Sequence, residues 1–216
     1  MSLFAEAMHQ GGWILWVILA VAVVAMAIAA ERLVYVFLRA DLNTRAFVVQ
    51  IHKLVTAGNI DLAMRLCAER PEAALARVVR AGLLHADASE TEIREAVEEA
   101  VLEVQPDLTR RTAYLPMLAN VATLLGLLGT VQGLILAFRA VARAGGDVRP
   151  ALLADGISLA MYSTFAGLAV AIPLLLLHGI VAHRSTRILT DVDLHGLQTV
   201  HWLRARRPTA PSPPAA

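Results

Sequence analysis

Three long stretches of this sequence contain no Asp, Glu, Lys or Arg, and more polar segments separate them. They cover residues 12–30, 115–138 and 156–182. Each is about as long as the ~20 residues that an α-helix needs to cross the hydrocarbon core of a bilayer. The pattern therefore predicts an all-α membrane protein with three transmembrane helices, at residues 13–38, 113–142 and 156–183.

The polar region between the first two of these helices, residues 39–112, is predicted to be a helical domain. Ser89 followed by Glu92 is a capping-box pattern, which is typical of a helix N-terminus. Ile93 and Val97 then begin an apolar series at helical spacing among glutamates, so this helix is predicted to be amphipathic. Two of the transmembrane helices are expected to be long and to extend into this domain. The remaining segments are predicted to be an N-terminal lead at 1–12, a loop at 143–155, and a helix with a disordered tail at 184–216.

Composition agrees with a membrane protein, and the placement of charge predicts its orientation. The chain is 57% hydrophobic, its mean hydropathy is +0.61, and its net charge is only +1. The nineteen Lys and Arg residues concentrate between residues 32 and 111 and after residue 182, and the first twelve residues contain none. The positive-inside rule then puts the N-terminus and loop 143–155 in the periplasm, and residues 39–112 and the C-terminus in the cytoplasm. Three arginines in or next to the outer loop, Arg139, Arg143 and Arg149, run against this rule.

Small residues recur at helical spacing along the second and third apolar stretches. In lipid, such residues mark helix interfaces because they allow the backbones to approach closely. They predict a tightly packed face on each helix. The residues are Gly126, Gly129 and Gly133 on the second helix, and Ala160, Thr164, Gly167 and Ala171 on the third.

Hydroxyl and amide side chains follow the same stretches and allow two interpretations. Each Ser or Thr can hydrogen-bond to a carbonyl one turn earlier on its own helix and have no further role. Alternatively, the side chains line a narrow polar path between helices, and the recurrence of Thr130 and Thr164 within small-residue stripes favours this. The candidate path residues are Asn120, Thr123, Thr130, Tyr162, Ser163 and Thr164.

No carboxylate lies in any of the three apolar stretches, and His178 is the one titratable imidazole there. A protein that moves protons through a membrane needs a group that is charged and neutralised in turn. If ions pass through this protein, the titrating carboxylate must therefore come from another polypeptide. No phosphate-binding loop or nucleophile motif occurs, and the histidines never pair at metal-ligand spacing. The single Cys67 has no cysteine partner. We therefore expect no catalytic residues, no metal, no cofactor and no nucleic acid, and we predict that the chain is not an enzyme.

The motifs LLGLLGTVQGLILAF (124–138) and GISLAMYSTFAGLAVAIP (156–173) resemble those of the MotA/TolQ/ExbB proton channel family, nearest to its ExbB/TolQ branch. This resemblance implies a multi-pass protein of the bacterial inner membrane that forms a homo-oligomeric ring, commonly of five copies. It also implies an ExbD/TolR-like single-span partner that carries a membrane Asp. The family's pore-lining threonines fall on Thr130 and Thr164, and its third-helix proline falls on Pro173. The function implied is that of a stator subunit of a molecular motor, which couples the proton motive force to work at the outer membrane or cell surface.

Two positions depart from the family pattern. Leu159 stands where many ExbB and TolQ proteins have a Glu, and His178-Gly179 replaces the usual aromatic-Asn pair. The sequence leaves Ton-like transport, envelope maintenance and gliding open as the energised process. Two other functions also stay open: a non-conducting oligomeric scaffold, and a sodium-driven stator of the same family.

Overall fold

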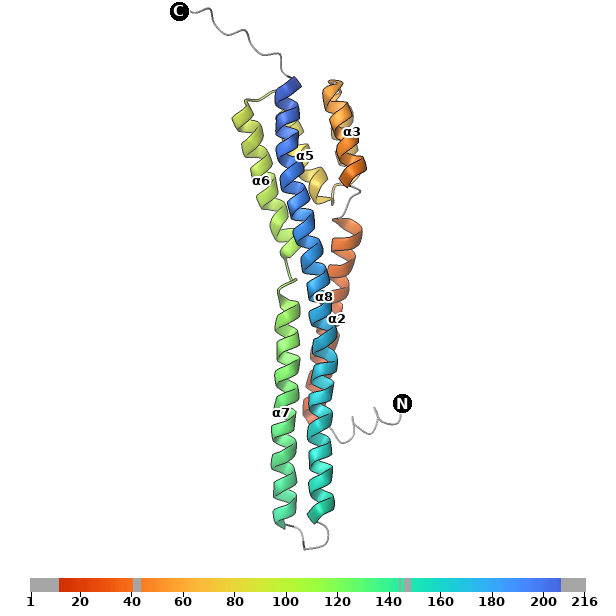
Figure 1. Ribbon diagram of the computed structural model, residues 1–216, viewed down its shortest axis with the longest axis vertical. Helices are drawn as coiled ribbons and strands as arrows, with labels where there is room; N and C mark the ends of the chain where they lie inside the picture. The colour runs from red at the N-terminus through yellow and green to blue at the C-terminus, as the bar shows by residue number, and fades with distance from the viewer. Residues whose placement is uncertain (1–11, 41–43, 144, 146–148, 207–216) are drawn as a thin grey trace, which may run out of the picture. The chain divides into compact units, whose positions relative to one another are not determined.

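The structure is a computed structural model in which residues 12–40, 44–143, 145 and 149–206 are described. Every regular element among these residues is a helix, and they contain no strand (Figure 1). The all-helical prediction is thus confirmed over the described ranges. Most of the predicted N-terminal lead, the middle of loop 143–155 and the tail after residue 206 lie outside them.

The helices follow one another with short connections. They are α2 (Gly12–Val34), its π-helical continuation η1 (Tyr35–Arg39), α3 (Thr44–Thr56), α4 (Ile60–Ala68), α5 (Ala74–Leu84), α6 (Glu90–Thr109), α7 (Tyr114–Arg143) and α8 (Arg149–Arg206). Three helical stretches are long and apolar enough to cross a membrane, and they lie within Trp13–Leu38, Glu90–Arg143 and Pro150–Arg206. The three predicted apolar helices are therefore present.

Helix α8 differs from its predicted bounds at both ends. It begins at Arg149, before the predicted start at residue 156, and continues through Pro173 to Arg206. Pro150 explains the early start, because the first turn of a helix has no intrahelical acceptor for the N–H that proline lacks. The predicted third transmembrane helix and the predicted C-terminal helix are accordingly one element.

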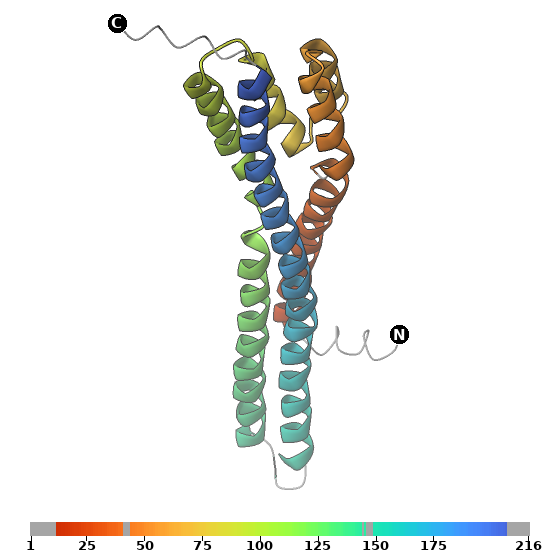
Figure 2. The same ribbon diagram turned by 45° about the horizontal axis from the view of Figure 1, so that its top comes forward.

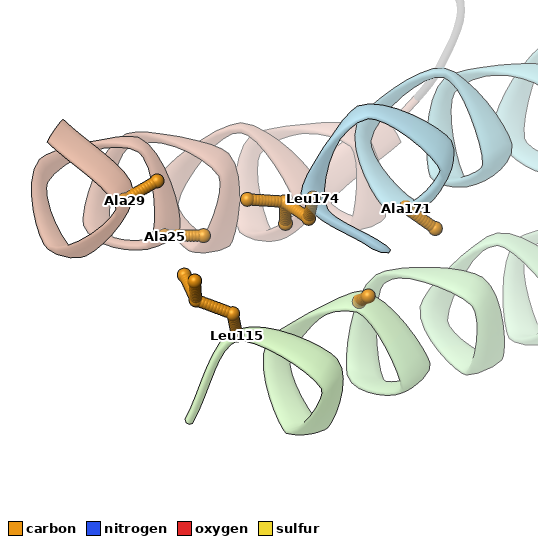
Figure 3. Packing of buried hydrophobic residues seen from close by; sticks show 6 residues of the cluster. Ala25, Ala29, Leu115, Ala171 and Leu174 are labelled. Atoms are coloured by element: carbon orange, nitrogen blue, oxygen red, sulfur yellow. The ribbon is translucent and has the colours of Figure 1, made fainter. Parts of the chain in front are cut away.

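The chain divides into two compact units, and the first contains α2 up to Arg32, α7, and α8 up to Val181. A buried apolar cluster joins these three helices, with half-buried Ile28, Leu118, Val170 and Leu177 packed around it. Most of its members are alanines, so the three backbones approach closely. Figure 3 labels Ala25 and Ala29 from α2, Leu115 from α7, and Ala171 and Leu174 from α8 in this cluster, which also contains Ala119 of α7.

The second unit contains η1, α3 to α6, and the part of α8 from Ala182 onward. In Figure 2 this part of α8, drawn in blue, runs beside α6. Gly196 of α8 faces both neighbours, since a Cβ added there would lie 3.1 Å from a methyl of Val97 on α6 and 3.2 Å from one of Val78 on α5. Arg204 also donates to Glu90 at 3.1 Å. The end of α8 is thus a structural part of this helical unit.

The predicted capping box at the start of α6 is confirmed. Ser89 Oγ accepts a hydrogen bond from the Glu92 backbone N–H at 3.3 Å, and the Ser89 N–H donates to the Glu92 carboxylate at 2.7 Å. These bonds satisfy two of the backbone donors that a helix start leaves without intrahelical partners.

Arg111, which lies between α6 and α7 in the sequence, forms a salt bridge. Arg111 has a φ of 61°, in the left-handed region that a side chain such as arginine seldom adopts. Its Nη1 donates to both carboxylate oxygens of Glu31 on α2, at 2.6 and 2.7 Å. The ion pair thereby ties the end of α2 to the start of α7 within the first unit.

Candidate functional site

Helices α7 and α8 meet along an antiparallel seam built from glycine and alanine. A Cβ added to Gly126 would lie 3.3 Å from the Cα atoms of both Thr164 and Gly167. Further along α7, a Cβ on Gly133 would lie 3.0 Å from the Cβ of Ala160. The two backbones are therefore in contact. Residues later in α7 lie against residues earlier in α8, as expected for antiparallel helices.

One side of this seam faces α2. Gly129 lies against Ser163 of α8, and a Cβ added there would also lie 3.5 Å from a methyl of Ile14 on α2. Farther along, Leu118 of α7 and Val170 of α8 pack against the cluster that contains the α2 alanines. This side of the seam is therefore covered by the chain's own first helix.

The opposite side of the seam carries threonines. On α7, Thr130 and Thr123 lie about 40° and about 60° around the helix from Gly126, in the direction away from Gly129. On α8, Thr164 lies about 40° from Ala160, in the direction away from Ser163. Because the helices are antiparallel, these rotations turn to the same side. We call the resulting row of Thr123, Thr130 and Thr164 the hydroxyl row.

Among the described residues, the helix surface next to the hydroxyl row is apolar and exposed. Leu127 of α7 is 57% exposed and Met161 of α8 is 68% exposed, although both belong to helices that are apolar enough to lie in lipid. The register places Thr130 and Thr164 within one helical turn of each other in height, and Thr123 about 10 Å from Thr130 along α7. The row therefore forms a polar line on an open apolar face.

Each hydroxyl of the row donates its hydrogen to a backbone carbonyl. Thr130 Oγ1 donates to Leu127 O at 2.6 Å, and Thr123 Oγ1 donates to Ala119 O at 3.0 Å. Thr164 Oγ1 donates across the seam to Gly126 O at 3.4 Å, a longer and weaker bond. The back-bonding that the sequence offered as an alternative to a path is thus present at positions that also face the open side.

The other predicted path residues, and Pro173, which was predicted to take part in helix packing, lie elsewhere in the first unit. Ser163 is 3% exposed and sits inside the seam, where its Oγ donates to Ala160 O at 2.7 Å and reaches Gly126 O at 3.3 Å. Tyr162 and Pro173 lie on the side of α8 away from the seam, about 160° and about 140° from its centre. Asn120 is exposed on α7, farther around the helix than Thr123. The structure therefore groups the threonines and separates the other candidates from them.

Two contacts of the first unit had no signal in the sequence. The Gly126 carbonyl lies within hydrogen-bond reach of both Ser163 and Thr164, which depends on the pairing register of the two helices. His178 Nδ1 lies 3.2 Å from the carbonyl oxygen of Thr112, at the end of the unit where Arg111 binds Glu31. Pairing across helices cannot be read from the spacing within one helix.

Titratable chemistry lies outside the hydroxyl row. Cys67 in α4 is 1% exposed, and its burial raises the pKa of the thiol to about 12, against a smaller opposing effect of Arg80. A buried neutral thiol is a poor nucleophile and metal ligand. Among the described residues, no group of three or more His, Cys, Asp and Glu side chains could hold a metal ion.

Comparison with known proteins places the chain in a family. Residues 70–193 match the model of the MotA/TolQ/ExbB proton channel family. The biopolymer transport protein ExbB-like 3 of Synechocystis is 31% identical over 77% of this chain and 79% of its own length. An ExbB homolog of Methanothermobacter thermautotrophicus is 26% identical over 88% of this chain and 66% of its own length. The exbB1 protein of Vibrio cholerae is 51% identical over 27% of this chain and 26% of its own length.

The chain thus spans slightly less than two thirds of the archaeal relative and about a quarter of the Vibrio relative. A solved structure, that of C. jejuni MotAB, is similar to this chain with a TM-score of 0.68, over 93% of this chain and 81% of that one. Its sequence is 18% identical, so this likeness concerns the fold. The family match covers more than half of the sequence, and the chain has three apolar helices long enough to cross a membrane. This multi-pass membrane protein belongs to the MotA/TolQ/ExbB proton channel family.

Proposed function

We propose that this chain is an ExbB/TolQ-like stator subunit of a proton-driven motor in the bacterial inner membrane. In this role it forms part of the proton path and couples the proton motive force to work at the outer membrane or cell surface. The observation that carries the proposal is the hydroxyl row, on the side of the α7–α8 seam opposite α2. A chain that only anchors or packs has no need of three hydroxyls on one open apolar face.

The titrating carboxylate is proposed to come from a single-span partner of the ExbD/TolR type. The apolar stretches of this chain have no Asp or Glu, while a proton path through lipid needs a group that gains and loses a proton. The similar solved structure is that of MotAB, a name that joins a second component to MotA. The division of labour is therefore hydroxyls and packing from this chain, and the carboxyl group from the partner.

Several copies of the chain are proposed to surround that partner in a closed ring, with five as the expected number. The apolar faces of α7 and α8 beside the row are exposed in the single chain, for example at Leu127, Val131 and Phe165. Closed rotational symmetry lets one such face meet a complementary face on the next copy without leaving open ends. The proposed topology keeps the N-terminus periplasmic and the C-terminus cytoplasmic, and the proposal gives the chain no enzymatic step.

The free energy released by each proton determines how many protons the proposed motor needs for one step. One charge crossing ~100 mV releases about 2.3 kcal/mol. Work on an outer-membrane or surface machine therefore requires several protons in each step, delivered in sequence. A path lined by neutral hydroxyls suits this purpose, because it adds no fixed charge that would trap the moving one.

The test is proton flux through the complex that copurifies with this chain, reconstituted in liposomes under an imposed pH gradient. We expect Thr130→Val and Thr164→Val to abolish flux, with Thr130→Ser as the control that keeps a hydroxyl. The mass of the purified complex must stay unchanged in all variants, so that loss of flux is not loss of assembly. Full flux in both valine variants would refute the proposed path.

The same measurement separates the two remaining functions. A non-conducting scaffold is favoured by the fact that Thr123 and Thr130 already bond to carbonyls of their own helix, and it predicts no flux in the wild type. A sodium-driven stator predicts output that depends on sodium and persists when a protonophore is added. The proton-driven proposal requires the opposite result in both respects.

A further inference from the structure

A groove of about 350 Å³ lies in the second unit, between α3 and the last turns of α8 (Figure 1). The ring of Trp202 on α8 meets the ring of His52 on α3, with the two centroids 4.8 Å apart and the planes tilted by 58°. Val49 of α3 also lines the groove and is 52% exposed. The other lining residues are Val48, Lys53 and Gln198. The groove is therefore an open surface of aromatic and aliphatic side chains.

Most polar groups of this lining are hydrogen-bond donors. Trp202 has an indole N–H and Lys53 has an ammonium group, and neither side chain has an acceptor atom. The Oε1 atom of Gln198 lies 2.8 Å from His195 Nδ1, so the amide N–H groups are what this side chain has left for a ligand. No Asp or Glu is among the lining residues that the structure describes. A ligand suited to this groove has an apolar body and many carbonyl oxygens.

The residues that follow α8 in the sequence have this chemistry. They read RPTAPSPPAA (207–216), and we call them the tail. Proline has no N–H, so the tail has more backbone acceptors than donors. Pro208, Pro211 and Pro214 recur at every third residue, and a polyproline II helix has three residues per turn. In that conformation these three rings lie along one edge, at intervals of about 9 Å.

The tail starts close enough to reach the groove. Helix α8 ends at Arg206, which lies about 6 Å beyond Trp202 along the helix axis. Pro208 opposes a longer helix, because the residue before a proline disfavours the helical region. The ten residues of the tail extend over about 30 Å as polyproline II, so enough chain remains after a turn to run back along the groove. Gln198 and Trp202 are about 6 Å apart along α8, so two successive prolines of the edge cover them.

We propose that the tail folds back as a polyproline II segment and docks in this groove of its own chain, with Pro211 against Trp202 and His52. Aromatic grooves recognise proline-rich segments in this way, and the donors of the lining bind backbone carbonyls that have no internal partner. A segment that its prolines already restrict loses little conformational entropy when it docks. The tail then links α3 to the end of α8. This contact does not depend on proton conduction.

The test uses the full chain in nanodiscs, with Ser212→Cys labelled by bimane, a dye whose emission tryptophan quenches on contact. Cys67 is 1% exposed, so the introduced cysteine is the one that reacts in the folded protein. Tethering gives an effective concentration on the order of 1 mM, so a contact with a dissociation constant of about 1 mM docks about half of the tails. Trp202→Phe, which removes the quencher, should therefore raise the emission about twofold.

Pro211→Ala and Pro213→Ala are matched variants on either side of the label. Pro211 belongs to the edge of three prolines and Pro213 does not. We expect Pro211→Ala to raise the emission nearly as much as Trp202→Phe, and Pro213→Ala to leave it close to that of the otherwise unchanged labelled chain. Both substitutions lie in the tail and leave every helix residue in place, so this comparison holds even if Trp202→Phe disturbs the fold.

Equal emission with and without Trp202→Phe would overturn the proposed docking, and so would equal effects of the two proline variants. Labelled chains with Trp202→Phe are also assembled with unlabelled chains that keep Trp202. Quenching in that mixture would mean that the tail docks on a neighbouring copy, and would overturn docking within one chain. A photoreactive benzoylphenylalanine in place of Val49 should cross-link to residues 207–216 of the same chain. A cross-link to a different polypeptide instead would assign the groove to a partner and overturn the proposal.

Discussion

Gly167→Ala is the substitution that tests the α7–α8 seam most directly. A Cβ at this position would lie 2.6 Å from the carbonyl oxygen of Ala122 and 3.0 Å from the Cα of Gly126. Both are backbone atoms in the middle of α7, so neither can rotate away as the tip of a side chain would. Restoring ordinary contact requires the two helices to separate by roughly 0.7 Å at this level.

The magnitude follows from overpacking of a tight interface. Added methyl groups in well-packed regions destabilise by about 1–3 kcal/mol, and the rigid neighbours here place Gly167→Ala in the upper part of that range. The same substitution gains up to about 1 kcal/mol in helix propensity, which leaves a net loss of about 2 kcal/mol. The midpoint of thermal unfolding should then fall by roughly 4–8 °C for a chain of this size. The separation should also lengthen the bond from Thr164 to Gly126 O, so proton flux should fall.

The matched control is Gly179→Ala on the same helix. Nothing lies within 4 Å of a Cβ added there, so the gain in helix propensity, up to about 1 kcal/mol, faces no clash. The assay is the fraction of detergent-solubilised protein that stays monodisperse in size-exclusion chromatography after heating. If Gly167→Ala kept the wild-type midpoint, or Gly179→Ala lost as much, the close approach of the α7 and α8 backbones would be refuted.

Four further predictions concern the second unit. Ser89→Ala removes the acceptor for the Glu92 N–H and should lower stability by about 1 kcal/mol, measured as denaturant midpoint, whereas Ser89→Asp should retain it. Gly58 has a φ of +79°, and nothing lies within 4 Å of a Cβ added there. Gly58→Ala should lower the stability of the protein by about 1 kcal/mol in the same assay, and Gly58→Asn should lower it less. Cys67 should resist iodoacetamide at pH 8.5 in the folded protein and react on unfolding, and labelling in the native state would contradict its burial. Because its folded pKa of about 12 exceeds the ordinary 9.0, the stability it contributes is complete below pH 9 and declines as pH rises toward 12.

The sequence was sufficient for features that depend on one helix at a time. Apolar length predicts the three long helices, and the Ser89–Glu92 spacing predicts where α6 begins, because both effects act within a few turns. The start of α8 at Arg149 was missed for a local reason. Only a short apolar run lies between Arg149 and Asp155, and its length suggests a loop. Pro150 is the signal for a helix start here, because proline is favoured in the first turn.

The sequence was insufficient where two helices have to be set in register. Ser163 and Thr164 are neighbours with similar side chains, and both fall next to the small-residue stripe. Only the pairing of α7 with α8 puts Ser163 on the α2 side, against Gly129, and Thr164 on the open side. A rotation of about 100° between consecutive residues decides which hydroxyl can meet a partner and which is sealed in the interface.

The same register shows that the two interpretations of the threonines, back-bonding and lining a path, are compatible. From the sequence, a threonine either bonds back to its own helix or lines a path. Thr130 does the first at 2.6 Å and also occupies the position required for the second. The two are compatible because a hydroxyl that donates backward still accepts forward. Back-bonding is thus no argument against a path.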